Sequence, residues 1–557
     1  MASAEVRMDR LSVLVRSLSP VGMLVGALFL AASLTPSLLP RGFVLQGALS
    51  GLACACGYLV GLLLRWLWNY LELPPPSQRA QRWALLVLGS LSLAIVVYFL
   101  WQAAAWQDSI RAVMQLEPLS ERRPFEVGGI ALLVFALVLA LARLVLFLHR
   151  FFTSRLERRL PRRSSRLLGG IIVGILLWTA IDGVLFRAAL RVADSTYGRL
   201  DALMEADVIQ PRDPMKTGSA ASLLGWEGLG RMGRSFIATG PRASDISAFT
   251  GRPAMEPLRV YAGLNSAGSV KERVALALAE LQRVGGFERS ILVIITPTGT
   301  GWVDPAAVDP LEYLHEGNVA SVGLQYSYLA SWLSLLVEPD YGADAARALF
   351  TAVYRHWTTL PHDHRPRLYL YGLSLGALNS DRSADIYDVI ADPFQGALWT
   401  GPPFPSPTWR WATAERDPGS PAWLPRFRDG SVIRFANQYG GADVASAPWG
   451  PIRFVYLQHA SDPIVFFEPD AGYREPAWMI PPLGPDVSPS LHWFPVVTLL
   501  QLGLDMALAT TAPMGYGHVY APEDHIDPWI QVTQPPAWAP AEVARLKEFF
   551  RAKRQGG

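Results

Sequence analysis

The stretch that decides the fold is Leu368-Tyr369-Leu370-Tyr371-Gly372-Leu373-Ser374-Leu375-Gly376-Ala377-Leu378. It begins as an apolar and aromatic run typical of a buried strand, passes through a G-x-S-x-G pattern and ends in residues that favour a helix. Strand, sharp turn and helix in this order form a nucleophile elbow, in which glycines avoid collisions between backbone segments. The helix N-terminus then favours a developing oxyanion. We therefore expect Ser374 to be a nucleophile.

From Leu258 onward, short β-branched runs alternate with helical patterns. This alternation is typical of an α/β domain with a mostly parallel sheet and helices on both faces. The expected strands are Leu258–Ala262, Ser290–Thr296, Ala320–Gln325, Arg367–Tyr371, Gly396–Thr400, Ser431–Ala436 and Ile452–Leu457. The expected helices are Val270–Val284, Gly342–Thr358, Leu375–Ile390, Leu491–Thr511 and Pro540–Arg554.

A nucleophilic serine needs a histidine as base and a carboxylate that orients the imidazole, and in this fold the acid precedes the histidine in the chain. Asp462 fits the acid, because it follows a predicted late strand and opens a short polar loop. Asp443 and Asp470 are the alternatives.

The candidate base is His518, in Gly515-Tyr-Gly517-His518-Val-Tyr, which we expect to be a mobile loop downstream of a long helix. His525 is the main alternative, since Glu523-Asp524-His525 also reads as a loop. His492 precedes an apolar helix and is predicted to be structural, and His459 is predicted to neighbour the acid loop. No histidine falls in a zinc-binding pattern such as H-E-x-x-H, so the sequence does not predict a metal site.

The oxyanion hole of such an enzyme uses two backbone N–H groups. One is expected from Leu375, directly after the nucleophile, and the other from the loop Thr298–Gly301 that follows the second predicted strand. Within this loop we favour Thr298 and Gly299, while a plain glycine turn is the alternative interpretation.

Composition indicates membrane-embedded segments before residue 200. Hydrophobic residues make up 51% of the 557, charged residues only 17%, and the mean hydropathy is +0.22. About 20 apolar residues suffice to cross a hydrocarbon core. Five stretches reach this length, near 18–39, 43–64, 83–105, 128–149 and 168–190.

The charge distribution predicts which side the domains occupy. Residues 1–200 contain 21 Lys and Arg against 10 Asp and Glu, whereas the remainder contains 28 against 37. Seven arginines between 150 and 166 mark the loop before the last expected span as cytoplasmic. Everything after residue 190 is then expected on the outer face of the cell membrane, and its acidic balance excludes a nucleic-acid partner.

Other features carry weaker signals. Arg143 and Asp182 lie inside expected spans, where we favour snorkelling or helix contacts over a transport role. Gly228, Gly230 and Gly233 spell G-x-G-x-x-G, but no strand is predicted before them, so we expect a flexible connection and no NAD or FAD. The expected organisation is a transmembrane helical domain at 1–190, a juxtamembrane linker at 191–257 and a catalytic domain at 258–557.

These features together resemble the bacterial membrane-anchored α/β-hydrolase family. The resemblance rests on the N-terminal spans, on Tyr371-Gly372-Leu373-Ser374-Leu375-Gly376 and on the His459-x-x-Asp462-Pro-Ile acid loop. It implies an α/β-hydrolase fold and a serine-hydrolase site. With Ser374, Asp462 and His518 as its expected catalytic residues, we expect no cofactor.

The leading functional hypothesis is a membrane-tethered serine hydrolase, esterase-like or lipase-like, that cleaves lipid or cell-envelope acyl esters. Thirteen tryptophans after residue 200 and apolar stretches at 399–425 and 476–495 favour a lipid substrate. One alternative is an acyltransferase that uses the same acyl-enzyme. The other is a non-catalytic scaffold or transport protein with a hydrolase-like domain.

Overall fold

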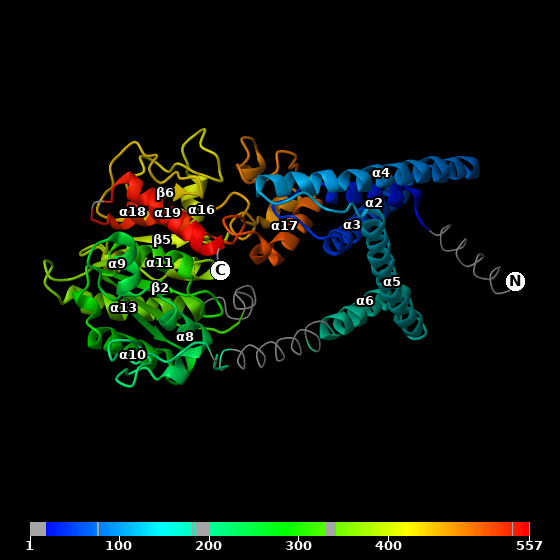
Figure 1. Cartoon of the computed structure of the whole chain (residues 1–557). Helices are drawn as coiled ribbons and strands as arrows, with labels where there is room; N and C mark the ends of the chain where they lie inside the picture. The colour runs from blue at the N-terminus through cyan, green and yellow to red at the C-terminus, as the bar shows by residue number, and fades with distance from the viewer. Residues whose placement is uncertain are drawn as a thin grey trace. The chain divides into compact units, whose positions relative to one another are not determined.

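The computed structural model describes residues 18–74, 77–180, 183, 201, 203–205, 207–329, 341–536 and 538–555. The chain forms two compact units (Figure 1). The helical unit comprises Met1–Arg187 and Phe467–Leu508, and the sheet unit comprises Ala188–Phe466 and Ala509–Gly557. This division differs from the expected domains at 1–190, 191–257 and 258–557 in two ways. The expected linker groups with the sheet unit, and residues 467–508 group with the N-terminal helices.

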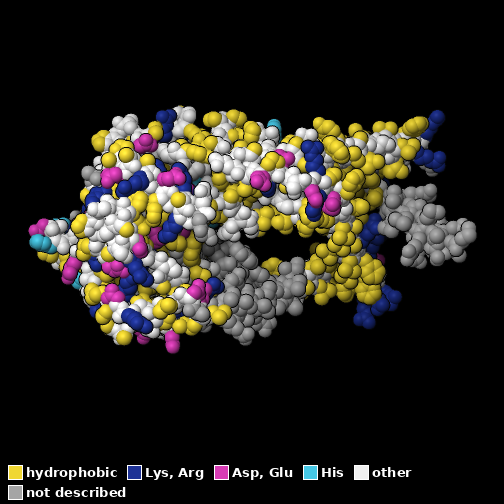
Figure 2. Space-filling view, viewed as in Figure 1, with side chains coloured by type: hydrophobic (Ala, Val, Ile, Leu, Met, Phe, Trp, Pro, Cys, Tyr) yellow, Lys and Arg dark blue, Asp and Glu magenta, His cyan; other side chains and the backbone are white. Residues whose placement is uncertain are grey.

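The helical unit is built from long apolar helices. Its elements are α2 (Pro20–Ser33), α3 (Phe43–Tyr70), α4 (Gln78–Val113), α5 (Pro124–Leu156), α6 (Arg162–Trp178), the 3-10 turns η5 (Pro469–Gly472) and η6 (Ala477–Met479), and α17 (Val497–Ala507). Of these, α3, α4 and α5 are long and apolar enough to cross a membrane. Figure 2 shows hydrophobic side chains covering α4 and α5. The helical unit is therefore that of a membrane protein.

The expected count of about five spans is not exact, because the described part of the chain contains three helices of sufficient length. The first expected span is the helix α2, whose 14 residues extend only about 21 Å at 1.5 Å per residue. The last expected span, 168–190, begins on α6, and its remainder, including Asp182, falls largely outside the described residues. Arg143 lies on α5, as expected.

Small residues let α2 and α3 approach closely. Gly22 and Gly26 on α2 and Gly57 and Gly61 on α3 each form a small-xxx-small pair. A Cβ atom added at Gly61 would lie 2.5 Å from the Cα atom of Gly22, and one at Gly57 would lie 2.6 Å from the carbonyl oxygen of Val25. Close backbone packing of this kind supplies the van der Waals contact that holds helices together in a membrane.

The sheet unit contains seven parallel strands, which confirms the predicted architecture. The strands are β1 (Leu258–Ala262), β2 (Ile291–Thr296), β3 (Val319–Leu324), β4 (Arg367–Leu373), β5 (Gly396–Thr400), β6 (Ile433–Ala436) and β7 (Arg453–Leu457). Their order across the sheet is β1-β3-β2-β4-β5-β7-β6. Strand β4 is central, pairing Ile295 with Tyr371 on one side and Leu398 with Tyr371 on the other. All strands thus present their carboxyl ends at one edge.

Helices cover both faces of the sheet (Figure 1). The elements α10 (Val270–Arg283), α13 (Tyr341–Thr358) and α14 (Leu375–Asp381) pack on one face, and α11 (Pro305–Leu314) and α18 (Pro522–Thr533) pack on the other. The remaining helices are α8 (Gly230–Ala238), α9 (Ala243–Thr250), α15 (Ile386–Val389), α16 (Pro407–Ala414) and α19 (Pro540–Gln555). Four 3-10 turns complete the unit, at η2 (Trp226–Leu229), η3 (Leu264–Ser266), η4 (Gly286–Glu288) and η7 (Ala509–Thr511).

Two expected helices are shorter than predicted. The helix after the elbow ends at Asp381, and Asp385 then caps the separate helix α15 by accepting the Tyr387 N–H at 2.9 Å. Helix α17 begins at Val497 rather than 491, because Pro495 lacks an N–H and restricts the residue before it.

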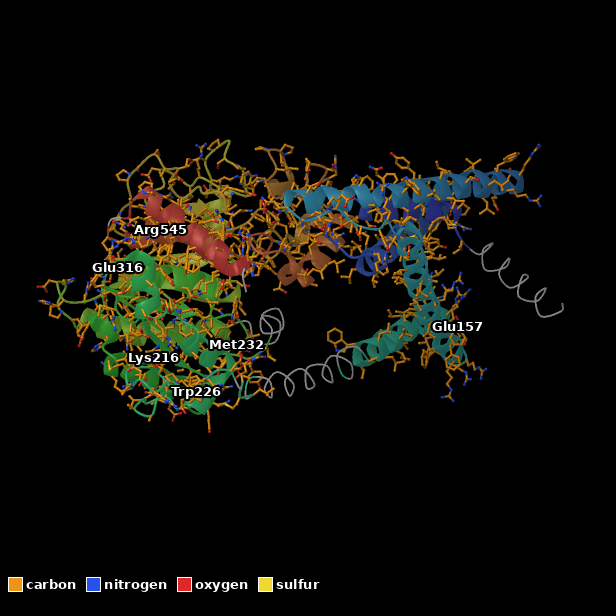
Figure 3. All side chains as sticks on the ribbon, viewed as in Figure 1. Glu157, Lys216, Trp226, Met232, Glu316 and Arg545 are labelled. Carbon is orange, nitrogen blue, oxygen red and sulfur yellow. The ribbon has the colours of Figure 1, made fainter. Side chains whose placement is uncertain are left out.

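The G-x-G-x-x-G glycines lie on ordered helical turns rather than on the flexible connection that we expected. Gly228 belongs to η2, and Gly230 and Gly233 belong to α8, close to Trp226 and Met232 (Figure 3). A Cβ atom at Gly233 would lie 2.4 Å from the Tyr261 ring on β1. Residues 207–225, which precede the three glycines, contain no strand, and Gly233 allows α8 to pack closely on β1.

We expect Gly61→Leu to destabilise the helical unit, since its side chain has to displace the α2 backbone. The cost of such overpacking is about 1–3 kcal/mol. Thermal unfolding in detergent would detect it as a lower Tm. Gly89→Leu on α4 is the matched control, because a Cβ atom there has nothing within 4 Å. Equal Tm values for the two variants would contradict the packing of α2 on α3.

Candidate active site

Ser374 stands on a strained turn between β4 and α14. Its backbone has φ 56° and ψ −125°, a region that L-residues other than glycine rarely occupy. The flanking glycines make the turn possible: a Cβ atom at Gly372 would lie 2.4 Å from the Gly376 carbonyl oxygen, and one at Gly376 would lie 2.2 Å from that of Thr296. The predicted nucleophile elbow is therefore present, and both glycines are needed for it to pack.

Neighbouring strands hold the elbow from both sides. The Ser374 N–H donates to the carbonyl oxygen of Thr400 at the end of β5, at 2.9 Å. On the other side, the close approach of Gly376 to Thr296 brings the end of β2 against the elbow. Ser374 is thus positioned by main-chain contacts at the carboxyl edge of the sheet.

Asp462 follows β7 and is fully buried. Its Oδ2 accepts hydrogen bonds from His518 Nδ1 and from the Tyr520 hydroxyl, both at 2.7 Å. Its Oδ1 accepts the Ile464 N–H at 2.8 Å. A buried carboxylate is tolerated only when it is satisfied in this way, and the three donors also fix its orientation.

His518 meets Asp462 through Nδ1, and the exposed fraction of its side chain is only 7%. Because a carboxylate can only accept, Nδ1 carries the proton and Nε2 is left as the acceptor. Among the described residues, Nε2 of His518 has no hydrogen-bond partner. A Cβ atom at Gly401 would lie 2.7 Å from the His518 ring, so glycine here lets the imidazole lie beside the backbone that also binds Ser374.

The loop that carries His518, which we expected to be mobile, is held by hydrogen bonds. The Gly517 N–H donates to the Ser461 hydroxyl at 2.9 Å, and the Gly517 carbonyl accepts His459 Nδ1 at 2.9 Å. Within the loop, the Gly515 N–H donates to the Val519 carbonyl at 2.7 Å. The base is therefore held by contacts from the acid loop itself.

His459 supports the site without belonging to it. Its ring stacks on Tyr520 with centroids 4.1 Å apart, and its Nε2 lies 3.3 Å from Asp524 Oδ2. Burial opposes ionisation of Asp524, but the hydrogen bond and charge of His459, together with the Ala521 N–H, outweigh it and lower the pKa of Asp524. This pair fixes the start of α18 and, through Tyr520, the position of Asp462.

The alternative residues lie elsewhere. His525 is buried on α18 rather than in a loop, with Nδ1 bonded to the Ala521 carbonyl at 3.0 Å, and burial lowers its pKa to about 4. Asp443 is exposed, and Asp470 belongs to η5 in the helical unit. His492 is also part of that unit, bonded to the Ser490 carbonyl at 2.9 Å. The structure thus joins Asp462 to His518 and brings none of these alternatives to the pair.

The two expected sources of oxyanion donors differ in whether their N–H groups already have a hydrogen-bond partner. Leu375 is the first residue of α14, where N–H groups lack an intrahelical partner. The Thr298 N–H is already donated to the Trp302 carbonyl at 3.0 Å. This turn lies directly after β2, whose last residue, Thr296, touches the elbow; Gly299 lies within the same turn.

The sequence did not predict that Asp304 caps α11, that the Tyr520 hydroxyl binds Asp462, or that residues 522–533 form a helix. Asp304 caps α11, with Oδ1 accepting the Ala306 N–H at 2.8 Å, and burial raises its pKa to about 7 while the nearby His518 opposes that rise. The signal for both helices was present as Asp304-Pro305 and as Pro522 before two acidic residues, since proline and acidic residues favour a first helical turn.

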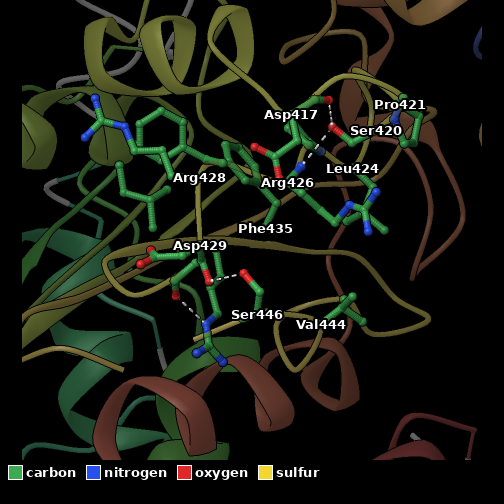
Figure 4. Close-up of a pocket in the computed structure, with 18 residues that line it drawn as sticks. Asp417, Ser420, Pro421, Leu424, Arg426, Arg428, Asp429, Phe435, Val444 and Ser446 are labelled. Atoms are coloured by element: carbon green, nitrogen blue, oxygen red, sulfur yellow. Dashed lines mark hydrogen bonds between the residues drawn. The ribbon is translucent and has the colours of Figure 1, made fainter. Parts of the chain in front are cut away.

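A separate cavity of about 490 Å³ lies beside the edge strand β6 (Figure 4). Its walls come from residues 417–430 and 441–446, and none of Ser374, Asp462 and His518 lines it. Among the described residues, no group of three or more His, Cys, Asp or Glu is arranged to hold a metal ion.

Acid should destabilise the sheet unit through His525. Its pKa is 6.5 ordinarily and about 4 when folded, so as the pH falls through this range the unfolded chain binds the proton first. The free energy of unfolding then drops by up to about 3 kcal/mol. His525→Phe removes this titration and should show a smaller fall in Tm between pH 7 and pH 5, measured by calorimetry. Parallel pH profiles for the two proteins would contradict the assignment.

Comparison with known families agrees with this geometry. A model described as "Alpha/beta-hydrolase family" matches residues 258–546, more than half of the chain, and one described as "Alpha/beta-hydrolase family N-terminus" matches residues 34–241. No curated protein and no solved structure matches the chain. The two models together cover helices α3 to α6 and the sheet that carries the elbow, and they confirm the resemblance drawn from the sequence. The chain belongs to the alpha/beta-hydrolase family.

Proposed function

We propose that the protein is a membrane-anchored serine hydrolase that cleaves carboxylic esters. The observation that carries the proposal is the His518–Asp462 pair, 2.7 Å apart, which leaves His518 Nε2 as an acceptor beside the backbone that holds Ser374. A serine on a strained elbow, a base with the correct tautomer and a buried orienting carboxylate are the parts that acyl transfer requires.

In the proposed reaction, the Ser374 hydroxyl oxygen attacks the ester carbonyl while His518 Nε2 takes its proton. Asp462 holds the imidazole and stabilises the imidazolium that forms. The imidazolium then protonates the leaving alcohol, and water repeats the sequence to release the acid. The Leu375 N–H supplies one oxyanion donor, and the turn containing Thr298 and Gly299 supplies the other. No cofactor takes part.

We infer that the substrate is a lipid or cell-envelope acyl ester. The chain carries helices of membrane length, so its sheet unit is tethered near a bilayer where such esters are concentrated. Tryptophans at 409 and 423 and the apolar stretch 399–425 directly follow β5, the strand that ends beside the elbow. Large apolar side chains near the site are suited to acyl chains.

We further propose that the sheet unit lies on the outer face of the cell membrane. The arginine-rich turn around Glu157 stands at the C-terminal end of α5 (Figure 3). Positive charge of this density stays cytoplasmic. At the other end of α5, Pro124 and Val127 line a cavity with Arg41, whose ion-pair partner, Asp505, belongs to the segment inserted from the sheet unit. That segment would therefore sit at the end opposite the cytoplasmic arginines.

A fluorophosphonate probe should label the wild-type protein at Ser374, because only an activated serine reacts with it. Ser374→Ala should abolish labelling, and His518→Ala should reduce it by about 10³-fold or more, in line with removal of a triad member. Ser446→Ala, which changes an exposed serine, is the matched control. Undiminished labelling of Ser374→Ala would refute the proposed nucleophile.

Reporter fusions test the side of the membrane. A reporter that folds only outside the cytoplasm should be active when fused after residue 215 and silent when fused after residue 160, next to the arginine-rich turn. A cytoplasmic fluorescent reporter should give the reverse pattern. Fluorescence from the fusion after residue 215 would overturn the outer placement.

A further inference from the structure

The segment Phe467–Leu508 interrupts the sheet unit between its proposed acid and base. Asp462 lies five residues before it and His518 ten residues after it. The segment nevertheless groups with the N-terminal helices, and α17 packs on α2 and α3. The chain that joins the two catalytic loops is therefore part of the membrane helix unit.

A fully buried ion pair fastens this segment to the helices. Arg41 Nε lies 3.0 Å from Asp505 Oδ1, and both side chains have an exposed fraction of 0%. Asp505 Oδ2 accepts the Leu38 N–H at 3.0 Å, so both carboxylate oxygens are used by the connection between α2 and α3. Residues 464 positions apart in the chain are thus joined by charge and hydrogen bonds.

Amide side chains complete the buried cluster. Gln501 Nε2, one turn before Asp505 on α17, donates to the Thr35 carbonyl at 3.1 Å. The Arg41 N–H donates to Gln107 Oε1 on α4 at 2.8 Å, and Arg41 also contacts Gln46 and Ser37. Polar side chains on α17 are therefore matched to carbonyl and amide groups of the membrane unit.

Hydrogen bonds also join the beginning of the segment to the start of α17. The Val496 N–H donates to the Gly472 carbonyl at 2.7 Å, and Trp493 Nε1 donates to the Ala471 carbonyl at 2.7 Å. Turn η5, just after the entry point, therefore packs against the start of α17. Docking of α17 thereby fixes the entry of the segment as well as its exit.

Because the ion pair is fully buried, docking is sensitive to the loss of either partner. Removing one partner leaves the other charge buried without compensation, which costs far more than the intact pair contributes. The acid loop is close to the entry point: the Phe466 N–H still donates to the Asp462 carbonyl at 3.1 Å.

We propose that Arg41 and Asp505 are positioning residues for the triad. By docking residues 467–508, they fix the two ends of the segment from which the Asp462 and His518 loops continue along the chain. This inference rests on the proposed serine hydrolase. It gives the helices a role that tethering alone would not require.

The test uses full-length protein in detergent micelles and the variant Arg41→Gln. Hydrogen exchange should rise about tenfold or more in residues 497–507 and also in 513–520, while exchange in β4 and β5 stays unchanged. On a short soluble ester, kcat should fall about tenfold or more, with KM changed less than about twofold, because the loss is one of catalytic geometry.

Two further variants keep the test decisive. Arg41→Lys retains the positive charge but loses the planar set of N–H donors of the guanidinium. It should therefore give an intermediate loss of kcat, and it should remain folded even if Arg41→Gln does not. Arg123→Gln removes an exposed arginine that pairs with Glu121 and should behave as wild type. Both variants are measured as full-length protein in the same detergent micelles and with the same ester as wild type and Arg41→Gln.

Three results would overturn the proposal. The first is unchanged exchange in 497–507, since the ion pair would then not hold the segment. The second is faster exchange there with 513–520 and kcat unchanged, since docking would then not reach the base. The third is a loss of kcat accompanied by faster exchange in β4 and β5, which is general unfolding. If the wild-type protein turns over no ester, the proposed reaction fails, and the exchange in 513–520 alone decides whether docking positions the loop.

Discussion

The buried Asp462 carboxylate is the constraint on which the site depends. A charge removed from water must be satisfied by donors, and Asp462 takes them from three places: His518, Tyr520 and the Ile464 backbone. These donors come from its own loop and from a segment more than fifty residues later. The carboxylate is therefore satisfied only when the loop before α18 is folded against the end of β7, which ties the formation of the base to the formation of the sheet.

Main-chain packing sets the position of the nucleophile in a similar way. The strained backbone of Ser374 persists because Gly372 and Gly376 allow contacts that any side chain would prevent, and because the Ser374 N–H is held by Thr400. Gly401 then admits the His518 ring beside the same backbone. The Ser374 N–H and the His518 ring thus both lie against the end of β5, and their placement follows from the sheet rather than from flexible side chains.

The sequence predicted what local pattern determines. Seven strands and the elbow were recognisable because alternation, β-branched runs and G-x-S-x-G are properties of neighbouring residues. The choice of His518 over His525 was open, since it depends on whether residues 522–533 form a buried helix against Tyr371 and Trp529. The role of residues 467–508 could not be predicted, because Arg41 and Asp505 meet only in three dimensions. The expected number of spans was not exact, because hydropathy marks apolar stretches and not where helices end, as Pro36 and Pro40 after α2 illustrate.

The central claim, that Ser374 acts with His518 and Asp462, is tested most directly by an experimental structure of the protein after reaction with a phosphonate ester. The account predicts a covalent bond from Ser374 Oγ to phosphorus, a phosphoryl oxygen within hydrogen-bond distance of the Leu375 N–H, and His518 still bonded to Asp462 with Nε2 facing the adduct. An adduct on another residue, or His518 turned away from Ser374 with its Asp462 bond intact, would contradict it.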